Sequence, residues 1–215
     1  MDKTRFDLYT DYLLSSFGQG SATMLSRLVD GAVSHDQITR LLARPPQPSP
    51  QLWQKVKPLV RKVESAQGVI IIDDSLSEKP STDESDLICW HWDHAKNHTV
   101  KGINFLTALY QVPGVSLPVA FDLVTKTELY LDPKTGKEKR RSPRSKHDRM
   151  RTLLRACIHN EIPFGYVLAD LWFAAADKMK FIVLGLHKHF VFPVQENRTV
   201  ALSAAAQQQG RARRS

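Results

Sequence analysis

The chain has 215 residues, of which 42% are hydrophobic, enough for one domain of ordinary size and a small appendage. Lysine and arginine number 30 against 22 aspartates and glutamates, a net charge of +8 that favours polyanionic partners, nucleic acid first. No stretch reaches the roughly 20 apolar residues of a membrane span, no signal peptide opens the chain, and Cys89 and Cys157 are its only cysteines. We therefore expect a globular, cytoplasmic protein with reduced thiols and no membrane partner.

The pattern of residues 1–44 predicts a small helical region. Apolar residues recur at helical spacing and glycine-containing turns interrupt them. Ser34 is the predicted N-cap of the last helix, which carries Arg40. Short helices around such turns are typical of a DNA-binding helix-turn-helix, and they fit a plain helical packing module equally well. Residues 45–50 then form a proline-rich linker.

Residues 51–203 alternate between strand and helix patterns. A helix over 51–65 precedes a strand from Gly68, and two β-rich runs follow, separated by a turn at Pro113-Gly114. A helix over 144–160, a strand over 164–169, a helix over 171–186 and a strand over 189–194 complete the pattern. Three strands, a helix, a strand, a helix and a strand is the order of the ribonuclease H-like fold. We expect an α/β domain with a mixed sheet flanked by helices.

Two predicted buried strands each lead directly into aspartate. The run Val69–Ile72 is followed by Asp73 and Asp74, and the strand that ends at Ala169 is followed by Asp170. In the predicted fold the two strands are neighbours, so their acids meet at one edge of the sheet. Carboxylate oxygens suit Mg²⁺ or Mn²⁺, whereas either acid alone could simply cap a helix. The pair favours a metal site.

A cluster of aromatic and polar residues covers 89–98. His91, His94 and His98 are candidate zinc ligands, but closed zinc sites usually contain paired cysteines and Cys89 stands alone. We therefore favour a role in DNA contact or in packing beside the acids.

A basic stretch occupies a predicted loop and the start of the following helix. Nearly all of its charges are positive, and their mutual repulsion is unfavourable unless an anionic partner is bound. The stretch therefore favours phosphate binding over plain solvated surface. With Arg40, the candidate DNA-binding residues are Lys137, Lys139, Arg140, Arg141, Arg144, Lys146 and Arg149.

Five segments share features with one family: 71–75 (IIDDS), 90–96 (WHWDHAK), 99–105 (TVKGINF), 169–173 (ADLWF) and 195–202 (QENRTVAL). In this order they resemble the DDE transposases of bacterial insertion sequences. More narrowly, they resemble the branch whose ribonuclease H-like catalytic domain has a long insertion before the final glutamate. The resemblance spans roughly residues 69–203 and rests on the ordered set.

The resemblance implies three carboxylates that hold two divalent ions, Mg²⁺ or Mn²⁺, about 4 Å apart. By motif, Asp74 matches the first acid because Ser75 follows it, and Asp170 matches the second. Asp73 is an accessory neighbour that a one-residue slip in register would exchange with Asp74. The implied partner is double-stranded DNA at the element's ends, bound with a second copy or with an intact transposase.

The chain does not show a clear counterpart of the family's third acid. In the family it is a glutamate on a helix well beyond the strand that ends near Val194, whereas Glu196 lies in the segment before the insertion. We therefore expect a shortened transposase with impaired catalysis and a disordered basic tail over 204–215. Three alternatives stay open: a non-catalytic DNA-binding fragment that competes with intact transposase, an active nuclease that uses Glu196, and a decayed fragment without function.

Overall fold

The computed structural model describes residues 3–17, 20–43, 48–196, 198–200, 203, 205 and 213–214. The chain divides into two compact units, Met1–Gln47 and Pro48–Ser215. None of the helices described is both long and apolar enough to cross a membrane.

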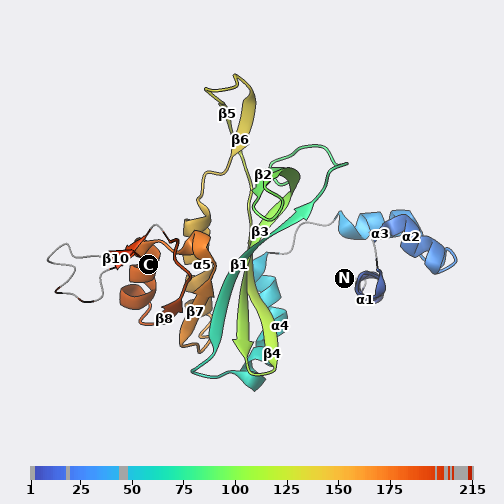
Figure 1. Ribbon diagram of the computed structural model, residues 1–215. Helices are drawn as coiled ribbons and strands as arrows, with labels where there is room; N and C mark the ends of the chain where they lie inside the picture. Colours follow the sequence, from blue (N-terminus) through green and yellow to red (C-terminus); the bar gives the residue numbers. More distant parts are fainter. Residues whose placement is uncertain are drawn as a thin grey trace. The chain divides into compact units, whose positions relative to one another are not determined.

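The first unit consists of the three helices α1 (Lys3–Ser15), α2 (Ala22–Leu28) and α3 (His35–Leu42) (Figure 1). One residue from each helix forms its buried core: Tyr12, Leu25 and Ile38. Helix α3 begins with a capping box, in which the Gln37 amide donates to Ser34 Oγ and the Ser34 amide donates to Gln37 Oε1. The predicted N-cap at Ser34 is confirmed.

The second unit is built on a mixed six-stranded sheet (Figure 1). Its strands are β1 (Val69–Glu78), β2 (Cys89–Asp93), β3 (His98–Val112), β4 (Val115–Leu123), β7 (Tyr166–Ala169) and β8 (His189–Val191). The spatial order is β2–β3–β1–β7–β8, and β4 also pairs with β3. Strand β3 is antiparallel to β1 on one side and β4 is antiparallel to β3, while β7 is parallel to β1 on the other side and β8 is parallel to β7. This arrangement confirms the predicted ribonuclease H-like fold class.

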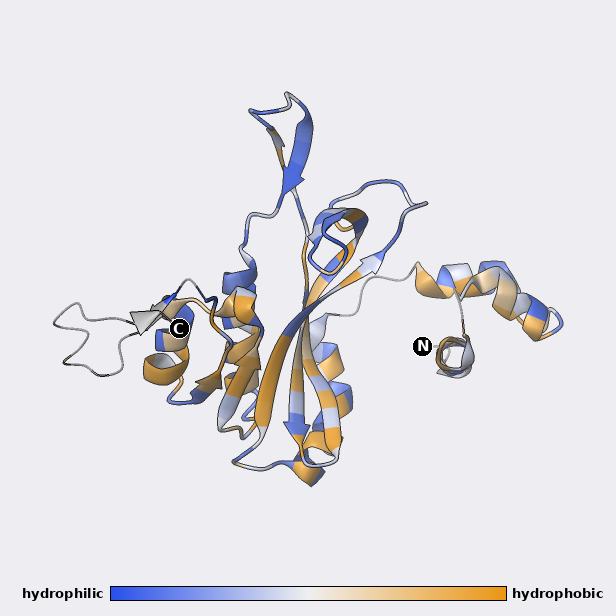
Figure 2. Ribbon diagram, viewed as in Figure 1, coloured by the Kyte–Doolittle hydropathy of each residue, from blue (hydrophilic) through white to orange (hydrophobic). Residues whose placement is uncertain are grey.

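The residues of strand β3 alternate between a buried face, which the helices cover, and a more exposed face. Along its length every second residue is buried, which is the period of side chains on one face of a strand. Its residues Leu106, Ala108 and Tyr110 join a core that includes Val60 of α4 (Ser49–Val63) and Leu154 of α5 (Lys146–His159). Helix α4 packs against β4, and α5 packs against β3 and β4. Figure 2 shows this apolar character concentrated in the strands and the facing sides of the helices.

The basic stretch is a hairpin rather than the predicted loop. Strands β5 (Glu128–Leu131) and β6 (Glu138–Arg141) pair with each other and extend away from the main sheet (Figure 1). The turn is formed by Asp132, whose carboxylate accepts from the Lys134 amide and from Thr135 Oγ1, and by Gly136 with φ of 64°. The hydrogen bonds between β5 and β6 therefore fix the backbone that carries the basic side chains of this hairpin.

The helix predicted over 171–186 is broken into three pieces. They are a 3₁₀ turn (η1, Leu171–Phe173), α6 (Ala176–Lys180) and a π-helical turn (η2, Phe181–Gly185). Ala175 has extended backbone angles, which interrupts the helical hydrogen bonds after the first turn.

Two further predictions differ from the structure. Strand β2 was not expected, and it extends the sheet along the first half of β3. Most of the tail at 204–215 lies outside the described residues, but Arg213–Arg214 forms β10 and pairs with β9 (Thr199–Val200), so the tail is not disordered throughout.

Candidate active site

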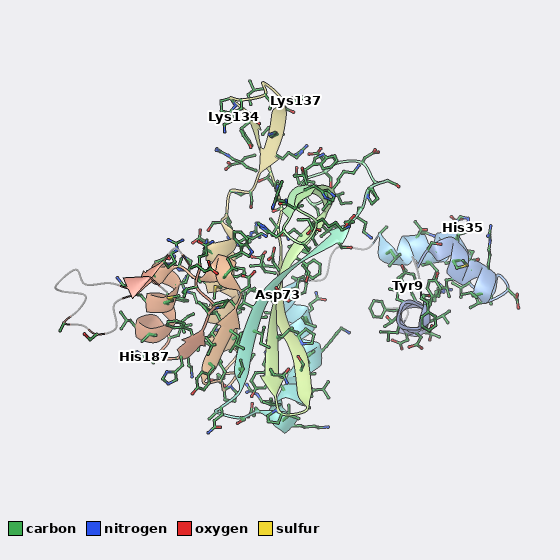
Figure 3. The ribbon with its side chains drawn as sticks, viewed as in Figure 1. Tyr9, His35, Asp73, Lys134, Lys137 and His187 are labelled. Atoms are coloured by element: carbon green, nitrogen blue, oxygen red, sulfur yellow. The ribbon has the colours of Figure 1, made fainter. Side chains whose placement is uncertain are left out.

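The register of two parallel strands brings the candidate acids together. Strands β1 and β7 pair from Val69 opposite Tyr166 to Ile72 opposite Ala169, where β7 ends. Strand β1 continues, paired only with β3 on its other side. Asp74 and Asp170 therefore follow the last paired residues of adjacent parallel strands, at the edge where open α/β sheets hold ligands. Figure 3 shows the neighbouring Asp73 near the middle of this sheet.

The acids line a cavity of about 280 Å³. Four aspartates contribute to it, together with Asn104 of β3 and other residues from β1, from β2 and the turn after it, and from η1. The lining residues are Asp73, Asp74, Leu76, Trp92, Asp93, His94, Ala95, Asn104, Asp170 and Trp172. Asp73 is exposed and Asp74 is half-buried, as expected from the alternation of side chains along β1.

Two groups already bond to the Asp74 carboxylate. Lys146 Nζ, from the first turn of α5, donates to Asp74 Oδ2, and Asn104 Nδ2 donates to the same oxygen at 3.1 Å. Burial raises the pKa of Asp74, but the hydrogen bonds from Lys146 and Asn104 and the charge of Lys146 outweigh it, so this pKa lies below its ordinary value. Asp74 is therefore held as a carboxylate.

Asp170 has the opposite environment. Its Oδ1 accepts from the Trp172 amide at 3.1 Å, which caps the 3₁₀ turn. Burial raises the pKa of Asp170, and the negative charges of Asp74 and Asp73 raise it further against the effect of the cap. The cap that the sequence allowed for Asp170 is therefore present, and Asp170 also lies near the charges of Asp74 and Asp73. A cation bound between these carboxylates would relieve their repulsion.

An aromatic wall borders the acids. The His94 ring stacks on the Trp172 ring with centroids 4.0 Å apart, and Trp92 contacts His94 edge-on at 6.5 Å. A second cavity, of about 290 Å³, lies beside the first and is lined by Asp74, His94, Lys146, His147, Trp172 and Phe173. The two tryptophan side chains are about half exposed, so they are available to a ligand that approaches the acids.

The remaining candidate residues divide between the hairpin, the surface and the core. Lys137, Lys139, Arg140 and Arg141 lie on the β5–β6 hairpin, and Figure 3 shows Lys134 and Lys137 at its far end. Arg144 is exposed, as is Arg40 on α3 of the first unit. Glu196 is exposed in a turn after β8 and lines neither cavity beside the acids.

Arg149 corrects one prediction. Its side chain is 3% exposed, and it donates to Asp122 Oδ1 at 2.7 Å and to the Leu123 carbonyl at 2.8 Å. A guanidinium that is buried and bonded in this way anchors α5 and does not meet a phosphate.

Several residues beside the acids gave only weak signals in the sequence. Asn104 is an amide at a buried position of an otherwise apolar alternation, which is the signal that could have identified it. His94 and Trp172 lie in segments noted for other reasons. Lys146 was predicted to bind DNA, and its contact with Asp74 joins residues 72 positions apart.

The donor set fits a hard divalent cation in its chemistry. Within the described residues, no group of three or more His, Cys, Asp or Glu side chains is arranged to hold a metal ion. Asp74 and Asp170 supply carboxylate oxygens, and the buried Oδ1 of Asn104 has no hydrogen-bond partner among the described atoms. Oxygen donors of this kind are the ligands of Mg²⁺ and Mn²⁺.

The strand order and the paired acids define the chain as a ribonuclease H-like α/β protein with its acids just beyond the paired part of β1 and β7. The family model described as DDE superfamily endonuclease matches residues 1–215. The chain therefore belongs to the DDE superfamily endonucleases.

Comparison with other proteins gives distant likenesses only. No curated protein matches the sequence. Two solved structures are similar, "Mos1 transposase paired-end complex with left transposon end" and "Crystal structure of the Mos1 mariner paired end complex with Mn". Each is 11% identical, with TM-scores of 0.29 and 0.30, over 86% and 83% of this chain. The chain spans 56% of the length of each, and at these TM-scores the likeness carries no structural weight.

Proposed function

We propose that this protein cleaves DNA phosphodiester bonds, with a divalent metal ion, in the transposition of a bacterial insertion sequence. The observation that carries the proposal is the convergence of Asp74 and Asp170 on one cavity, where the parallel pairing of β1 with β7 stops. Membership of the DDE superfamily endonucleases supports the reaction class. The partner is double-stranded DNA at the element's ends, bound by a dimer or together with an intact transposase.

In this proposal Asp74 and Asp170 hold Mg²⁺ or Mn²⁺, and Asp73, which lines the same cavity, assists. The bound metal would generate a nucleophile from water or a DNA 3′-hydroxyl and stabilise charge on the phosphate. Asn104 and Lys146 orient the Asp74 carboxylate and keep it ionised. The stacked rings of His94 and Trp172 border the acids on one side.

The proposal places DNA backbone contacts on the exposed cations. Lys137 is exposed near the hairpin's far end, while Lys139, Arg140 and Arg141 each face an acid that a phosphate would displace. Arg144 and Arg40 contribute further positive charge. Contacts of this kind position DNA without reading its sequence.

Nicking of supercoiled plasmid in Mg²⁺ or Mn²⁺ tests the proposal. We expect Asp74→Asn and Asp170→Asn each to reduce nicking at least about 100-fold, because each removes a metal ligand. Asp83→Asn, in the exposed loop between β1 and β2, makes the same chemical change away from the cavity and keeps wild-type activity. Nicking that survives in both site variants would refute a metal site at these acids.

A second candidate is DNA binding without cleavage. The bond from Lys146 to Asp74 favours it, because a protein cation already neutralises the carboxylate that a metal would need. The same experiment separates the two candidates, since salt-sensitive plasmid binding by a wild type that does not nick selects the second.

A further inference from the structure

A cavity of about 400 Å³ lies apart from the acids, between the β2–β3 ladder and the β5–β6 hairpin. It shares no lining residue with the cavity that contains the aspartates. Its walls include four cations, Lys126, Lys137, Lys139 and Arg140, against the two acids Glu84 and Glu138. The cavity therefore has an excess of positive charge.

Lys126 is the unusual cation of this set. Its Nζ donates to the Trp90 carbonyl at 2.5 Å, and no carboxylate of the described residues lies within 4.0 Å of it. Lys139 is instead paired with Asp132, and Arg140 with Asp86. Burial lowers the pKa of Lys126, against the effects of Cys89 and Glu84. A half-buried ammonium without an acid partner gains most from an anion that enters the cavity.

The neighbouring histidine reports the same excess charge. His91 is buried next to Cys89, with Nε2 3.2 Å from Sγ. Burial lowers the pKa of His91 to about 4, and the charges of Lys126 and Lys146 contribute to this shift. Lys126 therefore lies close enough to this buried ring for its charge to disfavour a second positive charge there.

Two exposed aromatic rings complete the cavity. Trp90 is 52% exposed and Tyr130 is 37% exposed, and both line the same space as Lys126. An exposed ring beside a phosphate-binding cation is the arrangement that proteins use to stack a nucleobase while they hold its backbone.

We propose that this cavity binds a single nucleotide of a DNA strand. Lys126 and Lys137 hold its phosphate, and its base stacks on Trp90 or Tyr130. The ligand class rests on the proposed function, because that function supplies the DNA. The site goes beyond it, since Lys126, Trp90 and Tyr130 have no part in the chemistry at the aspartates.

Binding of a short fluorescent single-stranded oligonucleotide to the full chain tests the proposal. We expect Lys126→Met and Trp90→Leu each to weaken binding about tenfold, which corresponds to a charge-assisted hydrogen bond or one stacked base. Lys126→Met should also lower the salt dependence by about one phosphate contact. Lys134→Met removes the same charge outside the cavity and serves as the matched control, with a change below about threefold.

Three outcomes overturn the inference: unchanged affinity in both cavity variants, equal losses in Lys126→Met and Lys134→Met, or binding of free dAMP but not of the oligonucleotide. The last would assign the cavity to free nucleotides. Matched urea midpoints show that the variants are folded. Plasmid nicking is measured in parallel. If Asp74→Asn loses nicking while Lys126→Met binds the oligonucleotide as the wild type does, the nucleotide site is refuted and the proposed function stands.

Discussion

Asp74 is held by a lysine from a different element, and this single contact controls what the site can bind. Lys146 and an incoming metal ion are both attracted to the same carboxylate. About 1 kcal/mol is typical of a partly exposed ion pair, and a metal ion must replace that interaction. In the proposed metal site, Lys146 would therefore lower metal affinity while it keeps Asp74 ionised.

Lys146→Met should strengthen Mn²⁺ binding about fivefold, because roughly 1 kcal/mol of competition is removed. Titration followed by the electron paramagnetic resonance of free Mn²⁺ measures this without DNA or turnover. Lys134→Met, which removes one charge near the hairpin's far end, should leave the affinity within about twofold. Unchanged or weaker binding in Lys146→Met would show that the lysine does not compete with the metal.

The sequence identified Asp74 and Asp170 because each ends a run of buried-strand residues. It could not identify the partners of Asp74. Asn104 lies 30 positions from Asp74 and Lys146 lies 72 positions away, so their contacts exist only once β3 and α5 are packed beside β1. The same limit explains Arg149, whose charge suggested DNA but whose burial follows from the docking of α5.

Helix α5 is the element that links the acids to the core. Its first turn supplies Lys146 to Asp74, and Arg149, one turn further, anchors it to the end of β4 through Asp122 and the Leu123 carbonyl. Met150, Leu153 and other apolar residues of the same helix are buried in the main core. Because both its buried ion pair and its apolar face fix α5 to the sheet, the helix holds Lys146 in place beside Asp74.

Arg149→Met should lower the free energy of unfolding by about 3 kcal/mol, because it leaves Asp122 without its buried partner. Urea unfolding followed by tryptophan fluorescence measures the change. Arg144 lies 3.5 Å from the same aspartate but is exposed, so Arg144→Met should cost less than about 1 kcal/mol. Equal effects of the two substitutions would show that burial does not decide the strength of the anchor.

At the scale of the molecule, each unit has a core of its own. Ile38 is fully buried in the first, while the second has the large core of sheet and helices. All four tryptophans, Trp53, Trp90, Trp92 and Trp172, lie in the second unit, so their fluorescence reports on that unit alone.

Ile38→Ala should destabilise the first unit by about 2–5 kcal/mol, through lost burial and a cavity that a small core cannot close. We expect helical circular dichroism to be lost at lower urea while the tryptophan midpoint stays unchanged. Leu154→Ala is the control for the second unit and should shift the tryptophan midpoint. A shift of that midpoint by Ile38→Ala would contradict independent cores.

The sequence by itself determined the main helices and most strands of the sheet, with the order in which they occur. Buried-strand runs, the Ser34 cap and the amphipathic helix α5 are local patterns, and local patterns are visible in sequence. The tertiary structure alone decided the strand β2, the hairpin β5–β6, the broken helix after Asp170 and the bonds to Asp74. Strand β2 and the bonds to Asp74 depend on residues distant in the chain, which meet only when the sheet is assembled. The hairpin and the break at Ala175 are local features of backbone conformation that the charge pattern and the helical spacing did not reveal.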